Sequence, residues 1–291
     1  MTQTEEHATS EGLVWLNGEF MDFASAKVSI DDRGFQFGDG VYEVVRVYDG
    51  RPFALEPHLA RLRQSLREIE LDIPLSDAEL AETARELIRR SGLREAEYYL
   101  QITRGVARRY HLFPVGVPPT IVMTVRPVRP VPLEWRERGI AVKTFPDERW
   151  GRCDIKSINL LPNVLAKERA HRVGAQEALL VRQGIVTEGT SSNFFFFNEG
   201  ALVTPLLGPH ILPGVTRNLV LQLAQQHGLH TIERNATLDE FKAASEVFLS
   251  STMMEMLAVV KIDDEPIGDG QPGPIFRQLY AAYQATVRSS E

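Results

Sequence analysis

The sequence predicts a mixed α+β protein with two domains. Three observations indicate this class. The chain has 291 residues, which is more than one minimal core requires. Segments with strand periodicity alternate with segments of helical periodicity along most of its length. A proline-rich segment at 126–132 separates an earlier set of these segments from a later one.

The segments before the prolines form one expected α+β unit. Alternating polarity predicts strands at 13–16, 41–47, 52–55, 97–103 and 120–125. An Asp-Gly pair at 49–50 is a favoured hairpin turn. Helices are expected at 57–69 and 76–90. In the first helix Leu59, Leu62 and Leu66 recur at helical spacing, and Ser76 is a suitable N-cap for the second.

The segment at 126–132 is expected to connect two domains. Its three prolines favour an extended backbone and cannot continue a helix. The expected organisation is a polar tail at 1–11, a small N-terminal domain at 12–126, a linker at 127–136 and a larger C-terminal domain at 137–291.

The same alternation continues after the linker. Strands are expected at 140–145, 178–182, 185–187, 193–198 and 201–204, and helices at 163–173, 216–227 and 274–288. No repeat of fixed period occurs in the sequence. The second domain is therefore also expected to be α+β.

The composition argues against several classes of function. Lys and Arg number 32 against 39 Asp and Glu, and no stretch combines basic with aromatic residues as a nucleic-acid groove requires. No apolar run approaches the roughly 20 residues needed to cross a bilayer, and the start of the chain is polar. We expect a cytoplasmic protein that binds neither nucleic acid nor membranes.

Cysteine and histidine usage predicts no metal site. Cys153 is the only cysteine, which excludes an intrachain disulfide and a multi-cysteine zinc site. The histidines are scattered without the HExxH spacing of zinc enzymes.

Lys156 is the first candidate for chemistry. Only six lysines occur in the chain, and Lys156 lies among apolar and small polar neighbours, whereas Lys167 lies in a charged run. An amine that attacks an aldehyde must be deprotonated, and burial or a nearby cation lowers its pKa. The alternative is a strand-edge lysine whose amine reaches solvent.

Three further segments contain groups that can bind an anion. The turn at 187–193 combines Glu188 with a glycine and hydroxyls, and is either an anion cradle or a polar turn between strands. Residues 212–216 precede a helix, so their N–H groups and the Thr216 hydroxyl either bind phosphate or cap the helix. Arg61 lies away from the leucine stripe, which predicts a solvent-facing side chain unless a ligand lies on that side.

Taken together, these segments resemble the fold type IV pyridoxal-phosphate enzymes. That family includes branched-chain aminotransferases, aminodeoxychorismate lyases and D-amino acid aminotransferases, and the similarity is greatest to the last. Matching segments follow in order along nearly the whole chain, at 32–43, 58–61, 103–105 and 149–150, around Lys156 and Glu188, and at 250–252. The resemblance implies a small α/β N-terminal domain, a larger C-terminal domain with a β-barrel-like core, and a cofactor at the domain interface.

The resemblance also implies roles for single residues. Lys156 would hold pyridoxal 5'-phosphate as an internal aldimine and, once released by substrate, carry a proton between the substrate's α-carbon and C4' of the cofactor. Glu188 would face the pyridine nitrogen and keep it protonated. The phosphate would be held by Arg61, Ser191, Val215, Thr216 and Thr252, and Leu212 would pack against the ring.

In D-amino acid aminotransferases a tyrosine binds the substrate carboxylate together with an Arg-x-His pair from the other subunit. This chain has Tyr42, Arg109 and His111 at the matching positions, although exposed loops also carry such residues for solubility. Two donors directed at one point suit a carboxylate. The resemblance therefore implies a homodimer that transfers amino groups between D-amino acids such as D-alanine and 2-oxo acids such as 2-oxoglutarate. The products would be pyruvate and D-glutamate, formed by a ping-pong mechanism.

Two positions depart from the family's pattern. Phe35 stands where relatives have tyrosine, and Pro162-Asn163 stands where they have small residues; both are interpreted as packing changes. Three other functions stay open: an L-branched-chain aminotransferase, which the pair of Arg109 and His111 argues against, an aminodeoxychorismate lyase, and a cofactor-binding protein without turnover.

Overall fold

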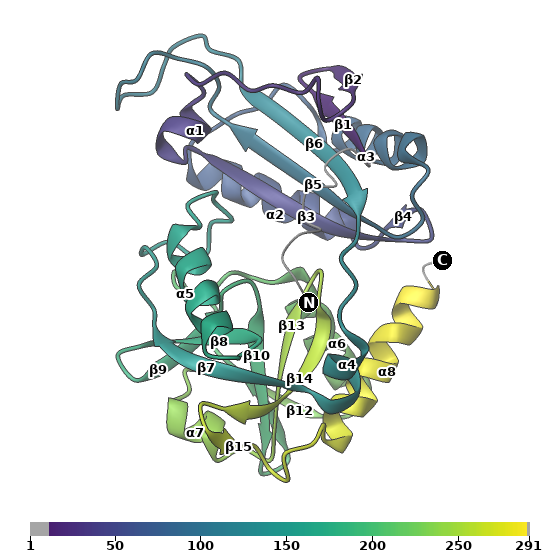
Figure 1. Cartoon of the computed structure of the whole chain (residues 1–291), viewed down its shortest axis with the longest axis vertical. Coiled ribbons are helices and arrows are strands. Elements are labelled where there is room, and N and C mark those ends of the chain that lie inside the picture. The colour runs from purple at the N-terminus through teal and green to yellow at the C-terminus, as the bar shows by residue number, and fades with distance from the viewer. Residues whose placement is uncertain (1–11, 290–291) are drawn as a thin grey trace. The chain divides into compact units, whose positions relative to one another are not determined.

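The first unit is organised around a six-stranded antiparallel sheet with the order β2-β1-β6-β5-β3-β4 (Figure 1). Its strands are β1 (Leu13–Leu16), β2 (Glu19–Met21), β3 (Gly40–Tyr48), β4 (Arg51–Pro52), β5 (Ala96–Thr103) and β6 (Thr120–Pro127). The computed structural model describes residues 12–289, so the tail expected at 1–11 lies outside the described residues.

Two of the three helices of the first unit pack on one face of this sheet (Figure 1). The three helices are α1 (Arg33–Phe37), α2 (Leu55–Glu68) and α3 (Asp77–Ser91), of which α2 and α3 cover the sheet (Figure 1). Leu59, Leu62 and Leu66 are buried in the core that α2 shares with the strands, as their spacing predicts. At the start of α3, Ser76 and Glu79 form a capping box.

The second unit contains a nine-stranded sheet with the order β12-β11-β10-β13-β14-β7-β8-β9, and β15 pairs with β14. Its strands are β7 (Ile140–Pro146), β8 (Glu177–Arg182), β9 (Ile185–Gly189), β10 (Asn193–Asn198), β11 (Ala201–Thr204), β12 (His230–Glu233), β13 (Glu246–Ser251), β14 (Glu255–Ile262) and β15 (Glu265–Pro266). Its helices are α4 (Leu133–Arg138), α5 (Leu161–Arg172), α6 (Val215–Gln226), α7 (Leu238–Lys242) and α8 (Pro274–Ser289).

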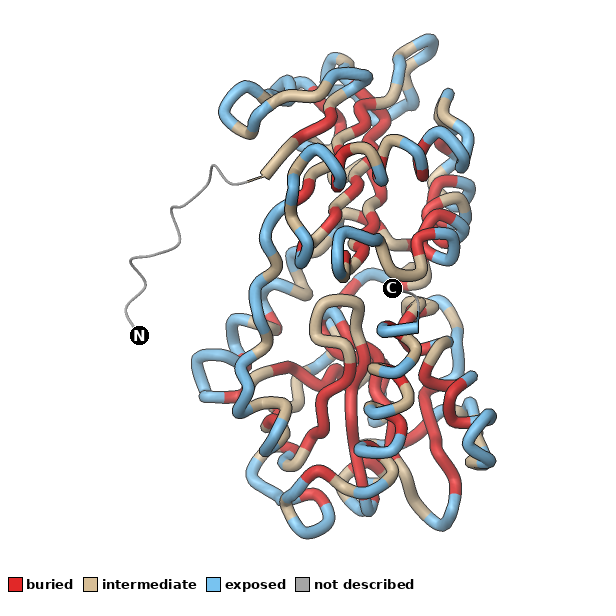
Figure 2. The backbone as a smooth tube through the Cα atoms, turned by 90° about the vertical axis from the view of Figure 1, so that its right-hand side faces the viewer, coloured by how far each residue is buried: buried red, intermediate tan, exposed pale blue. Residues whose placement is uncertain are grey.

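This second sheet is mixed and curled (Figure 1). Strand β7 pairs in parallel with β8 and β14, and β11 pairs in parallel with β12, while the other ladders are antiparallel. Its core is rich in phenylalanine and includes Phe194, Phe196 and Phe241. Buried residues run along the strands of both units in Figure 2. The predicted α+β class is confirmed.

Contacts divide the chain into two compact units. The first unit continues through Arg129, and the second starts at Pro130, inside the proline-rich segment. One short segment of the later sequence, Ile155–Asn159, belongs to the first unit. Nothing in its composition predicts this, and it is the segment that carries Lys156.

Several local features differ from the sequence prediction. Strands β2, β12, β13, β14 and β15 and helices α1 and α7 are present although the sequence did not predict them. The strand expected at 52–55 is wrong, because β4 ends at Pro52 and Ala54 adopts a left-handed conformation (φ 54°) before α2 begins. Four residues of alternating polarity are too few to distinguish a strand from the start of a helix. A helix, α4, begins within the segment expected as a linker, directly after Pro132. None of the helices among residues 12–289 is long and apolar enough to cross a membrane.

Candidate active site

Lys156 is held by its main chain at the start of β3. Its N–H donates to Ser65 Oγ (3.1 Å), and its carbonyl accepts from the N–H of Tyr42 (3.0 Å). The next residue, Ser157, forms an isolated antiparallel bridge with Val41. The side chain is half-buried, and Nζ lies 4.2 Å from the centroid of the Tyr42 ring. The backbone of Lys156 is thus fixed on both sides, while its amine stands over an aromatic ring.

Arg61 is buried in the same unit, contrary to the solvent-facing position that helical periodicity predicts. It is 9% exposed because Glu43 on β3 accepts from both its Nε (2.7 Å) and its Nη2 (2.8 Å). His58, one helical turn earlier on α2, places Nδ1 2.8 Å from the same carboxylate. The direction of the Arg61 side chain is therefore set by a strand residue.

Burial and charge act in opposite directions on this cluster. Burial opposes ionisation of Glu43, but the charge and hydrogen bonds of Arg61, with a hydrogen bond from His58, lower its pKa to about 2. Burial lowers the pKa of His58, against the effect of Glu43, and the Arg61 and Lys156 charges add to the lowering. The sequence suggests no separate role for Glu43 or His58. The spacing of His58 and Arg61 could have indicated a shared partner, because residues at i and i+3 lie on one face of a helix.

Arg109 and His111 lie in the exposed connection between β5 and β6, and both contact one ring. The Arg109 guanidinium carbon is 4.5 Å from the Phe37 ring centroid, and the His111 ring centroid is 5.5 Å from it. Tyr42 lies on β3 against Tyr99, with ring centroids 5.7 Å apart. Within the described part of one chain, no hydrogen bond or ring contact joins Tyr42 to Arg109 or His111. The structure thus groups two of the three predicted carboxylate-binding residues.

Glu188 is a buried carboxylate of the second unit, 5% exposed, near the end of β9. Its Oε1 accepts a short hydrogen bond from Arg149 Nη1. Its Oε2 accepts from Asn193 Nδ2 (3.0 Å) and from the N–H of Leu212 (3.1 Å), and Asn193 also donates to the Leu212 carbonyl (3.1 Å). Burial raises the pKa of Glu188, and the Arg149 charge opposes that rise. Both main-chain polar groups of Leu212 are therefore held beside Glu188.

Behind Glu188, Arg149 is held by Asp147. Nε and Nη2 of Arg149 each donate to the Asp147 carboxylate at 2.9 Å, and Thr187 Oγ1 donates to it at 2.9 Å. Burial disfavours the charged form of Asp147, but Arg149 and Thr187 lower its pKa to about 2. The sequence suggests no role for Asp147, because one carboxylate two residues before an arginine is too common a pattern to indicate one.

Ser191 and Thr252 lie in two neighbouring turns of the second unit. In the antiparallel pair β10 and β13, Asn193 is opposite Ser250, so the turn before β10 and the turn after β13 are side by side. At the same end, Ser192 Oγ and Ser250 Oγ are buried without a hydrogen-bond partner. Buried hydroxyls normally have one. This end of the sheet therefore offers polar groups to a ligand.

The start of α6 reaches the same place. A Cβ on Gly214 would overlap Asn193 Oδ1, which shows how closely Gly214 approaches the start of β10. No side chain caps α6, so the N–H groups of its first turn, which includes Val215 and the buried Thr216, lack a capping partner. Such a helix start favours anions. The four residues of this unit predicted to hold a phosphate thus converge at one end of the sheet.

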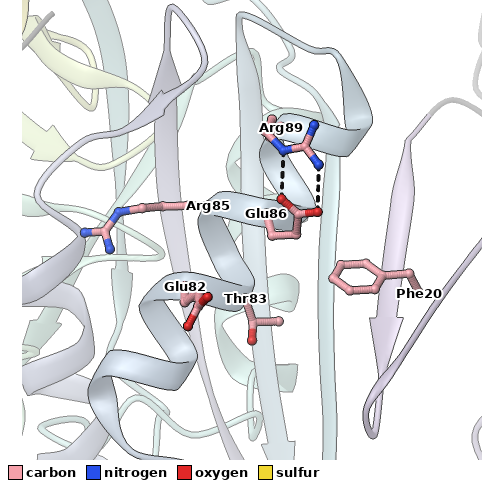
Figure 3. A pocket seen from close by; sticks show the side chains of 6 residues that line it. All are labelled: Phe20, Glu82, Thr83, Arg85, Glu86 and Arg89. Carbon is pink, nitrogen blue, oxygen red and sulfur yellow. Dashed lines mark hydrogen bonds and ion pairs between the residues drawn. The ribbon is translucent and has the colours of Figure 1, made fainter.

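Two cavities are lined by other residues than those predicted for the site, although Thr187, which donates to Asp147, lines the second. One, of about 450 Å³, lies against α3 and is lined by Phe20, Glu82, Thr83, Arg85, Glu86 and Arg89 (Figure 3). Its charges are largely paired, since Glu86 accepts from Arg89 and Arg90. The other, of about 360 Å³, lies beside Arg182 and His210. No predicted site residue lines either cavity. Residues 12–289 contain no cluster of three or more His, Cys, Asp or Glu side chains able to hold a metal ion.

Residues 40–262 match the family described as amino-transferase class IV. D-alanine aminotransferase of Bacillus licheniformis is 43% identical over 276 residues, covering 95% of this chain and 97% of that protein. The enzyme of the same name from Staphylococcus haemolyticus is 42% identical over 276 residues, covering 95% and 98%.

Solved structures of similar fold include branched-chain amino acid aminotransferases. The Escherichia coli enzyme superposes with a TM-score of 0.88 at 28% identity, covering 94% of this chain and 93% of that one. The enzyme from Thermoproteus uzoniensis with norvaline gives a TM-score of 0.85 at 28% identity, covering 96% and 95%. A third branched-chain enzyme, solved with pyridoxamine 5'-phosphate, gives a TM-score of 0.88 at 30% identity, covering 97% and 95%.

Proposed function

The chain belongs to the amino-transferase class IV family, and from that membership we propose that it transfers amino groups between D-amino acids and 2-oxo acids, using pyridoxal 5'-phosphate. With D-alanine and 2-oxoglutarate the products are pyruvate and D-glutamate. The reaction is ping-pong, because the cofactor carries the amino group between two half-reactions. The observation that carries the choice of D-amino acids is the 41–43% identity, over 95% of the chain, to curated D-alanine aminotransferases.

The residues present fit this cofactor. Its phosphate requires an anion site, and the second unit offers an uncapped helix start beside two buried hydroxyls without partners. Its ring nitrogen requires an acceptor. A carboxylate has about four acceptor positions, and three donors occupy those of Glu188, which leaves capacity for one more. When bound, the cofactor supplies a conjugated ring that withdraws the electron pair from the substrate's α-carbon.

Lys156 acts as the amine that binds the aldehyde carbon of the cofactor. With the cofactor and substrate bound, the Lys156 amine would be the base that moves the proton between the substrate's α-carbon and C4' of the cofactor. Support comes from its fixed main chain, which confines the amine to the reach of its side chain. The Tyr42 ring under Nζ further limits its direction.

Glu188 keeps the ring nitrogen protonated by lying next to it as an acceptor. Arg149, Asn193 and the N–H of Leu212 hold the carboxylate in one orientation, so it does not reorganise during the reaction. Leu212, whose main chain is fixed beside Glu188, would pack its side chain against the ring.

Each residue proposed to hold the phosphate is positioned by contacts within its own unit. From the second unit Ser191, Val215, Thr216 and Thr252 contribute hydroxyl and N–H donors. From the first unit Arg61 contributes a positive charge whose direction Glu43 determines.

The active protein is a homodimer in which Tyr42 of one subunit and Arg109 and His111 of the other bind the substrate carboxylate. Large apolar side chains around the β5–β6 connection support an interface, because exposed apolar clusters of this kind mark association sites. They are Phe35 (77% exposed), Tyr110, Leu112, Phe113 and Val115 (99% exposed). The cytoplasmic location expected from the composition stays a prediction.

A substrate comparison tests the function. Purified protein with pyridoxal 5'-phosphate and 2-oxoglutarate is incubated with D-alanine, L-alanine or L-leucine, and pyruvate or glutamate of each configuration is quantified. Turnover of D-alanine with formation of D-glutamate is expected. Turnover of the L-substrates alone would refute the proposal.

The second candidate is an L-branched-chain aminotransferase, which the TM-scores of 0.88 to such enzymes favour. The lower identity of 28–30% to those enzymes places it second. The L-leucine arm of the same experiment distinguishes the two. Release of pyruvate from aminodeoxychorismate without an amino acceptor would indicate the lyase alternative. An absorbance band of the bound cofactor that no amino acid changes would indicate a protein that binds it without turnover.

A further inference from the structure

The connection between β5 and β6, residues 104–119, contains no helix or strand. A buried arginine nevertheless forms hydrogen bonds to main-chain carbonyls near its centre. Arg33 on α1 is 4% exposed. Its Nη1 donates to the carbonyl of Tyr110 (2.6 Å), with a longer bond to that of Leu112 (3.4 Å). These two carbonyls are on either side of His111. One guanidinium therefore fixes the main chain around a residue proposed to bind substrate.

The residues around Arg33 also hold the beginning of this connection. The N–H of Arg33 donates to the carbonyl of Gly105 (2.9 Å), and the N–H of Ala107 donates to the carbonyl of Asp31 (3.1 Å). Asp32 and Val106 form the isolated bridge between these two bonds. Residues 105–107 of the connection are thus bonded through the main chain to residues 31–33, at the start of α1.

Phe37, at the end of α1, contacts the two side chains proposed to bind the substrate carboxylate. Arg109 and Arg33 place their guanidinium carbons 4.5 and 4.9 Å from its ring centroid. The His111 ring is tilted by 44° to the Phe37 ring, and the two centroids are 5.5 Å apart. Contact with this ring restricts the directions available to the exposed guanidinium group, which is that of Arg109.

A second anchor holds the far part of the connection. Arg104 donates to Asp39 (2.9 Å) and lies 3.6 Å from the Phe113 ring centroid. Asp39 accepts in addition from Arg33 Nε (2.8 Å), so a single carboxylate joins the two arginines. Arg109 and His111 therefore lie between the bonded start of the connection, at Gly105 and Ala107, and Phe113.

From these contacts we infer that Arg33 and Phe37 are positioning residues for the carboxylate site. They hold Arg109 and His111 in the geometry that selects amino acids over amines without a carboxylate. This inference rests on the proposed function, because it assigns Arg109 and His111 to the substrate. Beyond the proposed function, it assigns to α1 a role in orienting the two residues that bind the carboxylate, although no residue of α1 is proposed to bind substrate.

Two variants test the inference. Arg33→Lys keeps the charge beside Asp39 but loses the planar fork that spans two acceptors. Phe37→Leu keeps an apolar side chain but removes the ring. Each is expected to raise KM for D-alanine about tenfold, the effect of losing one well-directed charged hydrogen bond, with little change in kcat. Phe23→Leu is the matched control, since Phe23 also lies under an arginine, Arg126, at 4.1 Å.

A double-mutant cycle separates positioning from a general structural effect. If Phe37 acts through Arg109, then Phe37→Leu should raise KM in the wild-type background by a larger factor than in an Arg109→Ala background, where only its contact with His111 remains. Equal effects in both backgrounds would overturn the inference. Amide hydrogen exchange at residues 106–113 gives a readout without catalysis, and faster exchange is expected in Arg33→Lys than in Phe23→Leu.

The wild-type enzyme and Arg109→Ala show which statement fails. If the wild type does not turn over D-alanine, the proposed function is wrong, and the inference fails with it. If the wild type is active and Arg109→Ala binds D-alanine equally well, the assignment of Arg109 is wrong. If Arg109→Ala is impaired while Phe37→Leu and Arg33→Lys match Phe23→Leu, only the positioning role is refuted.

Discussion

At the residue scale, Lys156 combines a fixed main chain with a half-buried amine. Replacing it by alanine should reduce transamination by at least about 10³-fold, because the variant lacks the amine proposed to bind the cofactor and move the proton. The main-chain bonds to Ser65 and Tyr42 do not involve the side chain. The thermal midpoint should therefore change little.

Initial rates and thermal melts of Lys156→Ala check this, with Lys261→Ala, a lysine that is 46% exposed, as the control. Borohydride reduction followed by peptide mapping should place the cofactor on residue 156 in the wild type. A label on another lysine would contradict the assignment.

The Glu188–Arg149 pair has a consequence for the pH dependence of the reaction. Burial raises the pKa of Glu188 above its ordinary value of 4.5, and Arg149 opposes that rise. If the ionised form is the active one, kcat falls as pH drops through this raised pKa. Arg149→Met removes the opposing charge, so the acidic limb of the kcat profile should move to higher pH.

The pH profiles are measured at saturating cofactor, with Arg169→Met as the control. Arg169 is 48% exposed and pairs with Glu148 on the surface, so its removal should leave the limb in place. If the acidic limb of the kcat profile in Arg149→Met is unchanged or moves to lower pH, then ionisation of Glu188 does not determine that limb.

At the element scale, the junction of α6 with β10 depends on a glycine. A Cβ at position 214 would overlap Asn193 Oδ1, and Asn193 is a donor to Glu188. Gly214→Ala should therefore displace Asn193 and weaken cofactor binding by about 1–3 kcal/mol, the usual cost of overpacking. Titration of the apoprotein with pyridoxal 5'-phosphate measures the change.

Gly208→Ala is the matched control for this prediction. A Cβ at position 208 meets no atom within 4 Å, and its φ lies outside the left-handed region. Its affinity for the cofactor should equal that of the wild type. If the two alanine variants bind the cofactor alike, Gly214 has no role in the site.

Glu43 on β3 forms a buried cluster with His58 and Arg61 on α2, and this cluster predicts that the folded protein loses stability in acid. The pKa of Glu43 falls from 4.5 to about 2 in the folded protein. Because the folded-state pKa lies below the unfolded-state value, the stabilisation is present above pH 4.5 and is lost as pH falls from 4.5 towards 2. Its size is about 3 kcal/mol by the usual conversion of pKa units to free energy.

Urea unfolding of the wild type and of Glu43→Gln between pH 6 and 3 measures the contribution of this cluster to the free energy of unfolding. The variant should be less stable near neutrality by about 3–5 kcal/mol, because Arg61 stays buried without its partner. It should also lose less stability on acidification than the wild type. Parallel pH dependences in the two proteins would be inconsistent with a depressed Glu43 pKa.

At the scale of the whole molecule, the carboxylate site is proposed to need two subunits. Lys156→Ala and Arg109→Ala damage different parts of that site. In a heterodimer of the two variants, one of the two sites would receive an intact Lys156 and an intact Arg109. Random mixing should therefore restore roughly one quarter of the wild-type activity, because half of the dimers are mixed and half of their sites are complete.

Complementation is assayed after mixing, partial denaturation and refolding, at D-alanine below KM. Sedimentation of the wild type should give about twice the 32.7 kDa of one chain. A mixture no more active than the average of its components, or a monomeric wild type, would contradict the shared site.

How far the sequence alone predicts this molecule depends on the range of the interaction. The leucine stripe of α2 and the Ser76 cap of α3 follow from residues within one or two helical turns, and both are found as predicted. The strand expected at 52–55 is wrong, because its polarity pattern is short and Ala54 takes a left-handed conformation. Arg61 shows the limit most clearly, since its burial depends on Glu43, eighteen residues away on another element.

By itself the sequence determined the mixed α+β class, most of the helices and strands, and, through the family resemblance, the residues with proposed chemistry. Tertiary structure alone decided their partners: Ser65 and Tyr42 for Lys156, Asn193 for both Glu188 and Leu212, and Phe37 for Arg109 and His111. The physical reason is that helix and strand preferences depend on nearby residues. Such partnerships form only when the packed core brings distant parts of the chain together.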